Sequence, residues 1–221
     1  MKVFFLFSLL CLCLNALAWS ERGNGGNSII CDDPSQNKFY DAYEAEFRYG
    51  LKPVFPDTRR KCAGGLSCVN LSMRIARVFI DRLPDDADHL KKFMNSRVRR
   101  FRDDANFLDN INLLPIEDMG TAFVPKNCNL HQTVVQKPPR FPGDYRYIIS
   151  NDQWKDLSPN HQAVGIIHEL LYLYAGHMKQ KIEDSEGIRY FNALIISDEI
   201  SKLSTKQYAY IYRTVFSGNN E

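Results

Sequence analysis

A histidine and a glutamate stand side by side in an apolar stretch of the last third of the chain. His168 and Glu169 belong to the segment 164–172, which reads VGIIHELLY. In zinc hydrolases, an H-E-x-x-H sequence on a helix places two histidine ligands one turn apart, and the glutamate acts as general base on a metal-bound water. These two residues match the first half of such a site. A metal-assisted hydrolase acting on the cell envelope is therefore one hypothesis for the function.

The second half of the motif departs from the zinc pattern. Tyr172 occupies the position of the second histidine, and a neutral tyrosine is a poor zinc ligand, whereas catalytic zinc sites normally use three protein ligands. His177 lies so far after His168 that on one straight helix it would face the opposite side. It could act as a second ligand only if the chain reversed direction at Gly176. Two further histidines have no spacing argument behind them: His131 and His161.

The same segment also fits a structural role. Its helix is apolar on nearly every side, so we expect it to be buried, and a buried glutamate must be paired or neutralised. Arg189 on the following helix is the expected partner of Glu169. His168 and Tyr172 lie one turn apart and could share a hydrogen-bonded network. That network could also include two polar residues near Arg189, namely Ser185 and Asn192.

Other signatures of catalysis are weaker. No G-x-S-x-G sequence, P-loop or dinucleotide fingerprint is found. The acidic pair Glu117-Asp118 could join a two-carboxylate glycosidase site, although a pair of carboxylates in a loop is more often solvated. If the protein is catalytic, the candidate residues are His168, Glu169, Tyr172 and Arg189. If it binds a metal, zinc is the expected ion, and the candidate ligands are His168 and His177.

The first residues predict a secretory signal. Lys2 precedes the apolar run 3–14, and Ala16-Leu17-Ala18 supplies small residues at −3 and −1 of a cleavage site. The run is shorter than the roughly 20 residues of a transmembrane helix, and no later stretch could span a bilayer. We therefore expect a signal peptide over 1–18 and one mature domain over 19–221, exported to a periplasm or secreted.

The mature chain holds four cysteines, an even number that indicates two disulfides in an exported protein. Three connectivities are possible. Cys62 and Cys68 flank a Gly-Gly turn and could pair locally. Cys31 and Cys128 would then join the N-terminus to the second half of the chain, which stabilises the fold by restricting the unfolded state.

The charge balance argues against some partners. The chain has 28 Lys and Arg and 26 Asp and Glu, a net charge of +2, which falls by one with the signal. Such near-neutrality gives no support to a nucleic-acid partner or an acidic membrane. A basic helix over 85–102 could form a groove for an anionic polymer, but acidic residues flank both of its ends, so we favour a solvated face. A cell-envelope component is the expected partner.

The elements that must position these residues form an α+β order. Apolar spacing predicts N-terminal helices and, after Ser158-Pro159, C-terminal helices that carry the HELLY segment. The expected helices are 38–49, 71–83, 85–102, 158–174, 185–200 and 204–216. We expect the first of these to bury Phe39, Ala42, Tyr43 and Phe47, and the last to begin with a capping box at Ser204 and Gln207.

Between these helices, the segment 110–150 is rich in proline and short β-branched stretches. These predict a small antiparallel sheet built from 121–124, 131–136 and 145–150, with a further short strand at 28–31. We see no boundary that would split the mature chain, so a single α+β domain is expected.

The order of residues resembles a group of uncharacterised exported proteins of predatory Gram-negative bacteria. The pattern comprises H-E-x-x-Y at 168–172, G-H at 176–177 and S-x-x-x-R-Y-F-N at 185–192, with further matches at 23–31, 41–45, Asp118, Gly120, Cys128, Gln132, Gln136 and Trp154. In that group the serine follows G-H closely, whereas here 178–184 intervene. The resemblance implies a periplasmic or secreted protein but no activity. It also implies that Tyr172 belongs to the pattern, which favours a structural network in a non-catalytic envelope or interaction protein over a zinc hydrolase.

Overall fold

The computed structural model describes residues 26–57, 66–114, 123–178 and 185–217. Three features singled out in the sequence lie outside these ranges. They are the predicted signal peptide, the acidic pair Glu117-Asp118, and Cys62.

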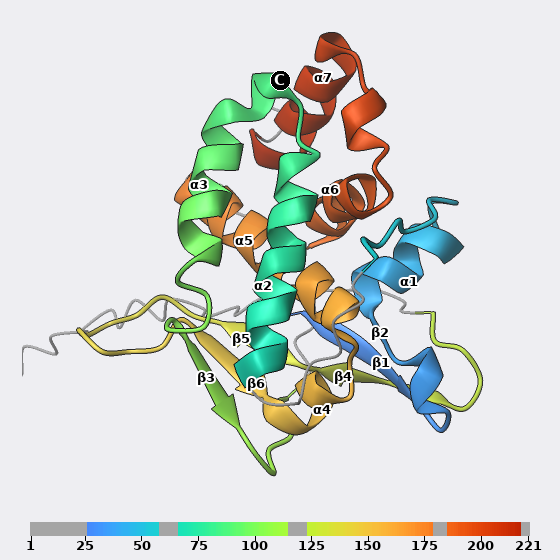
Figure 1. Ribbon diagram of the computed structural model, residues 1–221, viewed down its shortest axis with the longest axis vertical. Coiled ribbons are helices and arrows are strands. Elements are labelled where there is room, and N and C mark those ends of the chain that lie inside the picture. Colours follow the sequence, from blue (N-terminus) through green and yellow to red (C-terminus); the bar gives the residue numbers. More distant parts are fainter. Residues whose placement is uncertain (1–25, 58–65, 115–122, 179–184, 218–221) are drawn as a thin grey trace, which may run out of the picture.

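Helices make up most of the described chain (Figure 1). They are α1 (Tyr40–Phe47), α2 (Leu66–Asp81), α3 (Asp88–Val98), α4 (Asn151–Lys155), α5 (Pro159–His177), α6 (Glu186–Ile196) and α7 (Thr205–Phe216). Ser158 caps α5 with Pro159 in its first turn, and Ser204 and Gln207 form the capping box that begins α7, as predicted. Several helix ends were predicted wrongly: α2 begins at Leu66, α5 continues through Gly176 to His177, and the helices expected to end at 102 and 200 end at Val98 and Ile196. The short helix α4 was not predicted.

The strands form two three-stranded sheets rather than one. They are β1 (Asn27–Cys31), β2 (Lys38–Phe39), β3 (Ala105–Leu108), β4 (Cys128–Gln132), β5 (Val134–Gln136) and β6 (Tyr147–Ser150). The first sheet has the order β2-β1-β4 and is antiparallel. The second has the order β3-β6-β5, in which β5 is antiparallel and β3 is parallel to β6. The fold is therefore α+β, although the expectation of one antiparallel sheet was wrong.

The two sheets meet at Thr133. The predicted strand 131–136 divides there, because the backbone N–H of Thr133 donates to Gly26 while its carbonyl accepts from Ser150. Its hydroxyl donates to Ser28 Oγ at 2.8 Å. Each side of Thr133 thus belongs to a different sheet. The predicted strand at 121–124 falls largely outside the described residues, and its last two residues form no strand.

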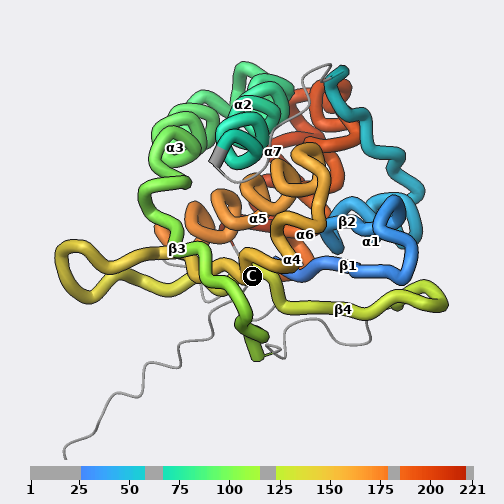
Figure 2. The backbone as a smooth tube through the Cα atoms, turned by 60° about the horizontal axis from the view of Figure 1, so that its bottom comes forward, coloured from blue at the N-terminus to red at the C-terminus, as the bar shows by residue number. Residues whose placement is uncertain are grey.

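The helix α5 lies at the centre of the molecule. It packs against α1, α2, α3 and α6, and twelve of its residues are buried. Figure 2 shows α2 and α3 on one side of α5 and the strands on its other side. Residues on every side of α5 are therefore enclosed, which confirms that the HELLY segment is buried.

The buried face of α1 differs from the predicted one. Phe39 and Ala42 are buried, but Phe47 is 57% exposed. The face that contacts α5 and α6 instead includes two carboxylates, Asp41 at 1% exposure and Glu44 at 4%. Apolar periodicity does not identify this face, because the two acidic residues are buried against polar partners.

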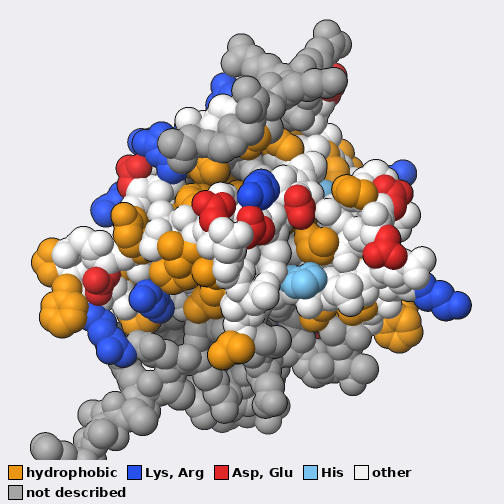
Figure 3. All heavy atoms as spheres, turned by 90° about the horizontal axis from the view of Figure 1, so that it is seen from below, with side chains coloured by type: hydrophobic (Ala, Val, Ile, Leu, Met, Phe, Trp, Pro, Cys, Tyr) orange, Lys and Arg blue, Asp and Glu red, His pale blue; other side chains and the backbone are white. Residues whose placement is uncertain are grey.

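The described part of the face with the strands shows hydrophobic side chains beside acidic and basic ones (Figure 3). In the described ranges, no helix is both long and apolar enough to cross a bilayer.

Candidate functional site

Polar side chains of α5 and α6 contact one N-terminal segment, residues 26–44. Three of its residues, Gly26, Asp41 and Glu44, each meet a buried polar group from the C-terminal third of the chain. We call these contacts the polar clasp. Each joins residues more than a hundred positions apart, and each is enclosed by the hydrophobic core.

The first contact of the clasp is centred on Asp41. His168 Nδ1 donates to Asp41 Oδ2 at 2.8 Å, and Asn192 Nδ2 donates to the same oxygen at 2.7 Å. Burial by itself lowers the pKa of His168, but the adjacent charge and hydrogen bond of Asp41 outweigh burial and raise that pKa above its ordinary value. The pair therefore favours an imidazolium held by a carboxylate. His168 Nε2 is buried and meets no polar partner in the described part of the chain.

The second contact holds Glu169. Its Oε1 accepts from the backbone N–H of Gly26 and its Oε2 accepts from Gln136 Nε2, both at 2.9 Å. Burial raises the pKa of Glu169 to about 7, against the lowering effects of His168 and of these two donors. The expected partner Arg189 is not the residue that binds Glu169, so this pairing was predicted wrongly.

The third contact belongs to Arg189. Its Nε donates to Glu44 Oε2 at 2.6 Å, and a guanidinium nitrogen donates to Ser185 Oγ. Both side chains of the ion pair are almost fully buried, at 3% and 5% exposure. The more exposed Arg48 also contacts Glu44, with its guanidinium nitrogen 3.0 Å from Glu44 Oε1. The sequence therefore identified Arg189, Ser185 and Asn192 as network members but assigned the wrong carboxylate to the arginine.

Close packing of Phe39 brings the N-terminal segment onto α5. A Cβ at Gly165 would lie 2.7 Å from Cε2 of the Phe39 ring, and a Cβ at Gly26 would lie 2.1 Å from its Cζ. Real side chains do not tolerate such distances, so the glycines permit this approach. The ring of Phe39 also lies 5.9 Å from that of His168. The glycine of the VGIIHELLY segment is therefore required for the clasp geometry.

The remaining candidate ligands are not brought to His168. Because α5 is continuous, His177 lies on the far side of the helix, where its ring is 5.8 Å from that of Phe93. His131 contacts Gln153, and His161 is packed near Phe55. Within the described ranges, no three His, Cys, Asp or Glu side chains are grouped so that they could hold a metal ion. Neither His168 nor Glu169 opens onto a cleft, since they are 2% and 0% exposed.

Tyr172 lies one turn beyond His168 and is half-buried. It lines a cavity of about 360 Å³ together with His177 and Gln136. Gln136, which lines the same cavity, donates to both the carboxylate and the backbone carbonyl of Glu169.

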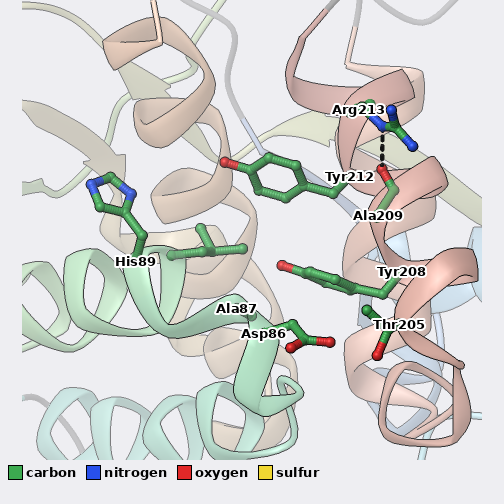
Figure 4. A pocket seen from close by; sticks show the side chains of 9 residues that line it. Asp86, Ala87, His89, Thr205, Tyr208, Ala209, Tyr212 and Arg213 are labelled. Atoms are coloured by element: carbon green, nitrogen blue, oxygen red, sulfur yellow. Dashed lines mark hydrogen bonds between the residues drawn. The ribbon is translucent and has the colours of Figure 1, made fainter.

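A second cavity, of about 450 Å³, separates the start of α3 from α7. Tyr208 and Tyr212 of α7 point into it, toward the segment that carries His89 (Figure 4). A hydroxyl chain borders it, since His89 Nδ1 lies 3.0 Å from Tyr174 Oη, which lies 2.5 Å from Tyr212 Oη. The wall of this cavity also includes two oppositely charged residues, Asp86 and Arg213.

The sequence analysis identified the polar residues of α5 and α6 but missed the residues that they contact. Gly26, Asp41, Glu44 and Gln136 were noted only as matches to the exported group or not at all. The available signal was the placement of Asp41 and Glu44 three positions apart on a helix, which puts both on one face. Their partners could not be assigned without the tertiary arrangement.

A disulfide joins the N-terminal segment 26–44 to strand β4. Cys31 and Cys128 are directly paired residues of β1 and β4 and are covalently linked. Cys68 is also disulfide-bonded, and its expected partner Cys62 lies outside the described residues. The pairing of Cys31 with Cys128 is therefore confirmed.

Comparison with protein-family models, curated proteins and solved structures finds no match to this chain. The functional argument therefore depends on the geometry alone.

Proposed function

We propose that the protein is an exported, non-catalytic binding protein of the cell envelope, in which His168, Glu169 and Arg189 hold the fold together. One observation carries this proposal: each of the three is buried and hydrogen-bonded to a partner from residues 26–44. Catalytic groups must contact a substrate, and in the described part of the chain none of these side chains lines either of the two cavities. The polar clasp instead fixes the N-terminal segment on α5 and α6.

Export is part of the same proposal. The apolar N-terminal run with its A-x-A site supports secretion. The oxidised cysteines fit an oxidising compartment such as a periplasm or the cell exterior. Sequencing of the mature N-terminus tests this, and the expected first residue is Trp19. Recovery of the protein in the cytosol with its first 18 residues intact would contradict it.

The structural role is tested by truncating the clasp and measuring metal content. His168→Ala leaves the Asp41 carboxylate buried without its cation, which costs about 3–5 kcal/mol. Glu169→Ala leaves two buried donors without an acceptor and opens a cavity, so a loss of about 2–5 kcal/mol is expected. For a domain of this size each kcal/mol lowers the melting temperature by roughly 2–4 °C.

His177→Ala is the matched control, since it removes an exposed histidine of the same helix. We expect it to change stability by less than about 0.5 kcal/mol. Elemental analysis of the oxidised protein is expected to find no stoichiometric metal. Stoichiometric zinc that disappears in His168→Ala, with an unchanged melting temperature, would refute the proposal in favour of a zinc hydrolase.

A further inference from the structure

A cavity at the C-terminal end of α5 has the composition of a ligand site. It is about 360 Å³ in volume and lies between α3, the end of α5 and the connection from β5 to β6. Figures 1 and 2 show α3 and this connection on the same side of the molecule. The volume is within the range of small-molecule sites, which is roughly 300–1,000 Å³.

Three cations from three segments line this cavity. They are Arg97 of α3, Lys137 after β5 and Arg146 before β6. None of them has a carboxylate within 4.0 Å among the described residues, whereas Lys92, Arg100 and Arg102 nearby do have such partners. Among the described residues that line the cavity, none is acidic. Convergent positive charge without an internal counterion favours an anion, because charge-assisted hydrogen bonds to oxyanions are strong.

Aromatic side chains line the same cavity. Phe93 and Tyr172 both line the cavity. The guanidinium of Arg97 lies 5.5 Å from the Phe93 ring centroid, and the His177 ring lies 5.8 Å from it. Aromatic faces of this kind accommodate rings by stacking and edge contacts. The cavity therefore combines an anion-binding side with a surface for a flat apolar group.

The wall between the cavity and the protein core is held rigidly. Gln136 is only 8% exposed, and its Nε2 is fixed by both the carboxylate and the carbonyl of Glu169 at 2.9 Å. A wall held by buried hydrogen bonds does not have to be ordered when a ligand binds, which reduces the entropic cost of binding.

We propose that this cavity binds a phosphomonoester carried on a ring-shaped body, with Arg97, Lys137 and Arg146 on the phosphate and Phe93 and Tyr172 against the ring. The phosphomonoester is favoured over a carboxylate because its second negative charge balances more of the three cations. This proposal rests on the proposed binding function, and it gives Arg97 a role beyond the solvated face expected for the basic residues of 85–102.

Calorimetric titration of the oxidised mature protein with phenyl phosphate is the test. We expect saturable binding, weaker binding of inorganic phosphate, which lacks the ring, and no binding of benzyl alcohol, which lacks the charge. Arg97→Gln and Lys137→Gln each remove one charge-assisted contact and are expected to weaken binding by about tenfold or more. Arg99→Gln is the control, because Arg99 is an exposed arginine just beyond α3 that does not line the cavity.

A second arm identifies the source of the phosphate. Vesicles containing phosphatidylinositol 4-phosphate present a phosphomonoester on the ring of a lipid headgroup, and cosedimentation that Arg97→Gln abolishes would support the site with a lipid as its source. Absence of binding in both arms, or an equal loss in Arg99→Gln, would overturn the proposal. Thermal melting separates this failure from failure of the clasp: a protein that binds nothing but is destabilised by His168→Ala retains the proposed structural network.

Discussion

Asp41 is the residue whose replacement should most directly reveal the polar clasp. It accepts hydrogen bonds from His168 and Asn192 on one oxygen, within 2.8 Å, and it is 1% exposed. Asp41→Asn keeps the size of the side chain and removes its charge. Two unit charges about 4 Å apart interact by about 4 kcal/mol at an effective dielectric constant of 20. This agrees with the roughly 3–5 kcal/mol lost when one member of a buried ion pair is removed.

The sign of the pH dependence provides a stricter test. In the wild type, Asp41 raises the pKa of His168, so the stability from this pair is fully present below pH 6.5 and is lost as the pH rises through the folded-state pKa. In Asp41→Asn, burial dominates and the pKa of His168 falls below its ordinary value. In the variant, the free energy of unfolding is lowered only at acid pH, where the buried imidazole must either carry a charge without a counterion or stay deprotonated below its ordinary pKa. The difference in unfolding free energy between wild type and variant should therefore be larger at pH 5.5 than at pH 8.

Urea denaturation at both pH values measures the free energies, and NMR titration of the imidazole measures the pKa directly. Because Glu169 and Arg189 also act on His168, the comparison uses the difference between the two proteins at each pH. Glu46→Gln is the control on the same helix, since Glu46 forms only an exposed ion pair with Lys38, worth about 0–1 kcal/mol. A cost below about 1 kcal/mol for Asp41→Asn, a cost that grows with pH, or an unchanged pKa of His168 would refute the reasoning.

Three further perturbations have defined outcomes. Replacing Cys31 and Cys128 by serine opens a loop with a sequence separation of 97, and chain entropy predicts a loss of about 4–5 kcal/mol in urea denaturation; a loss below about 1 kcal/mol would contradict this. Glu169, whose pKa rises from 4.5 to about 7 on folding, should make the wild type less stable as the pH rises between these values, by roughly 3 kcal/mol. Glu169→Gln should flatten that decline, and a decline that persists would assign it to another group. Gly165→Ala would place a Cβ 2.7 Å from the Phe39 ring and should cost about 1–3 kcal/mol by overpacking, measured as a lower melting temperature; an unchanged melting temperature would show that the ring can move.

Local signals in the sequence were sufficient to predict the helices and their caps. The capping box of α7 and the Ser158-Pro159 start of α5 depend only on residues within one turn, and the structure confirms both. The end of α5 was harder, because a glycine near a helix terminus is tolerated when the surrounding packing continues the helix. Gly176 is such a case.

Long-range partners were not predictable from one sequence. The division of 131–136 into two strands depends on contacts of Thr133 with Gly26 and Ser28, about a hundred positions away. For the candidate site, burial of the HELLY helix was correctly expected from its composition. The partners of Glu169 could not be predicted. Arg189 would neutralise a buried carboxylate equally well, and only the tertiary approach of residues 26–44 shows that Gly26 binds it instead.

The clasp and the disulfide together constrain the order in which the chain can assemble. The clasp contacts of residues 26–44 span 143, 127 and 145 positions. These residues are synthesised long before the residues of α5 and α6 that they contact. Nonlocal contacts of this kind slow folding. Cys31 meets Cys62 and Cys68 along the chain before it meets Cys128. Oxidation that precedes the pairing of β1 with β4 would therefore favour mispaired disulfides, and thiol–disulfide exchange would then be needed to join Cys31 to Cys128.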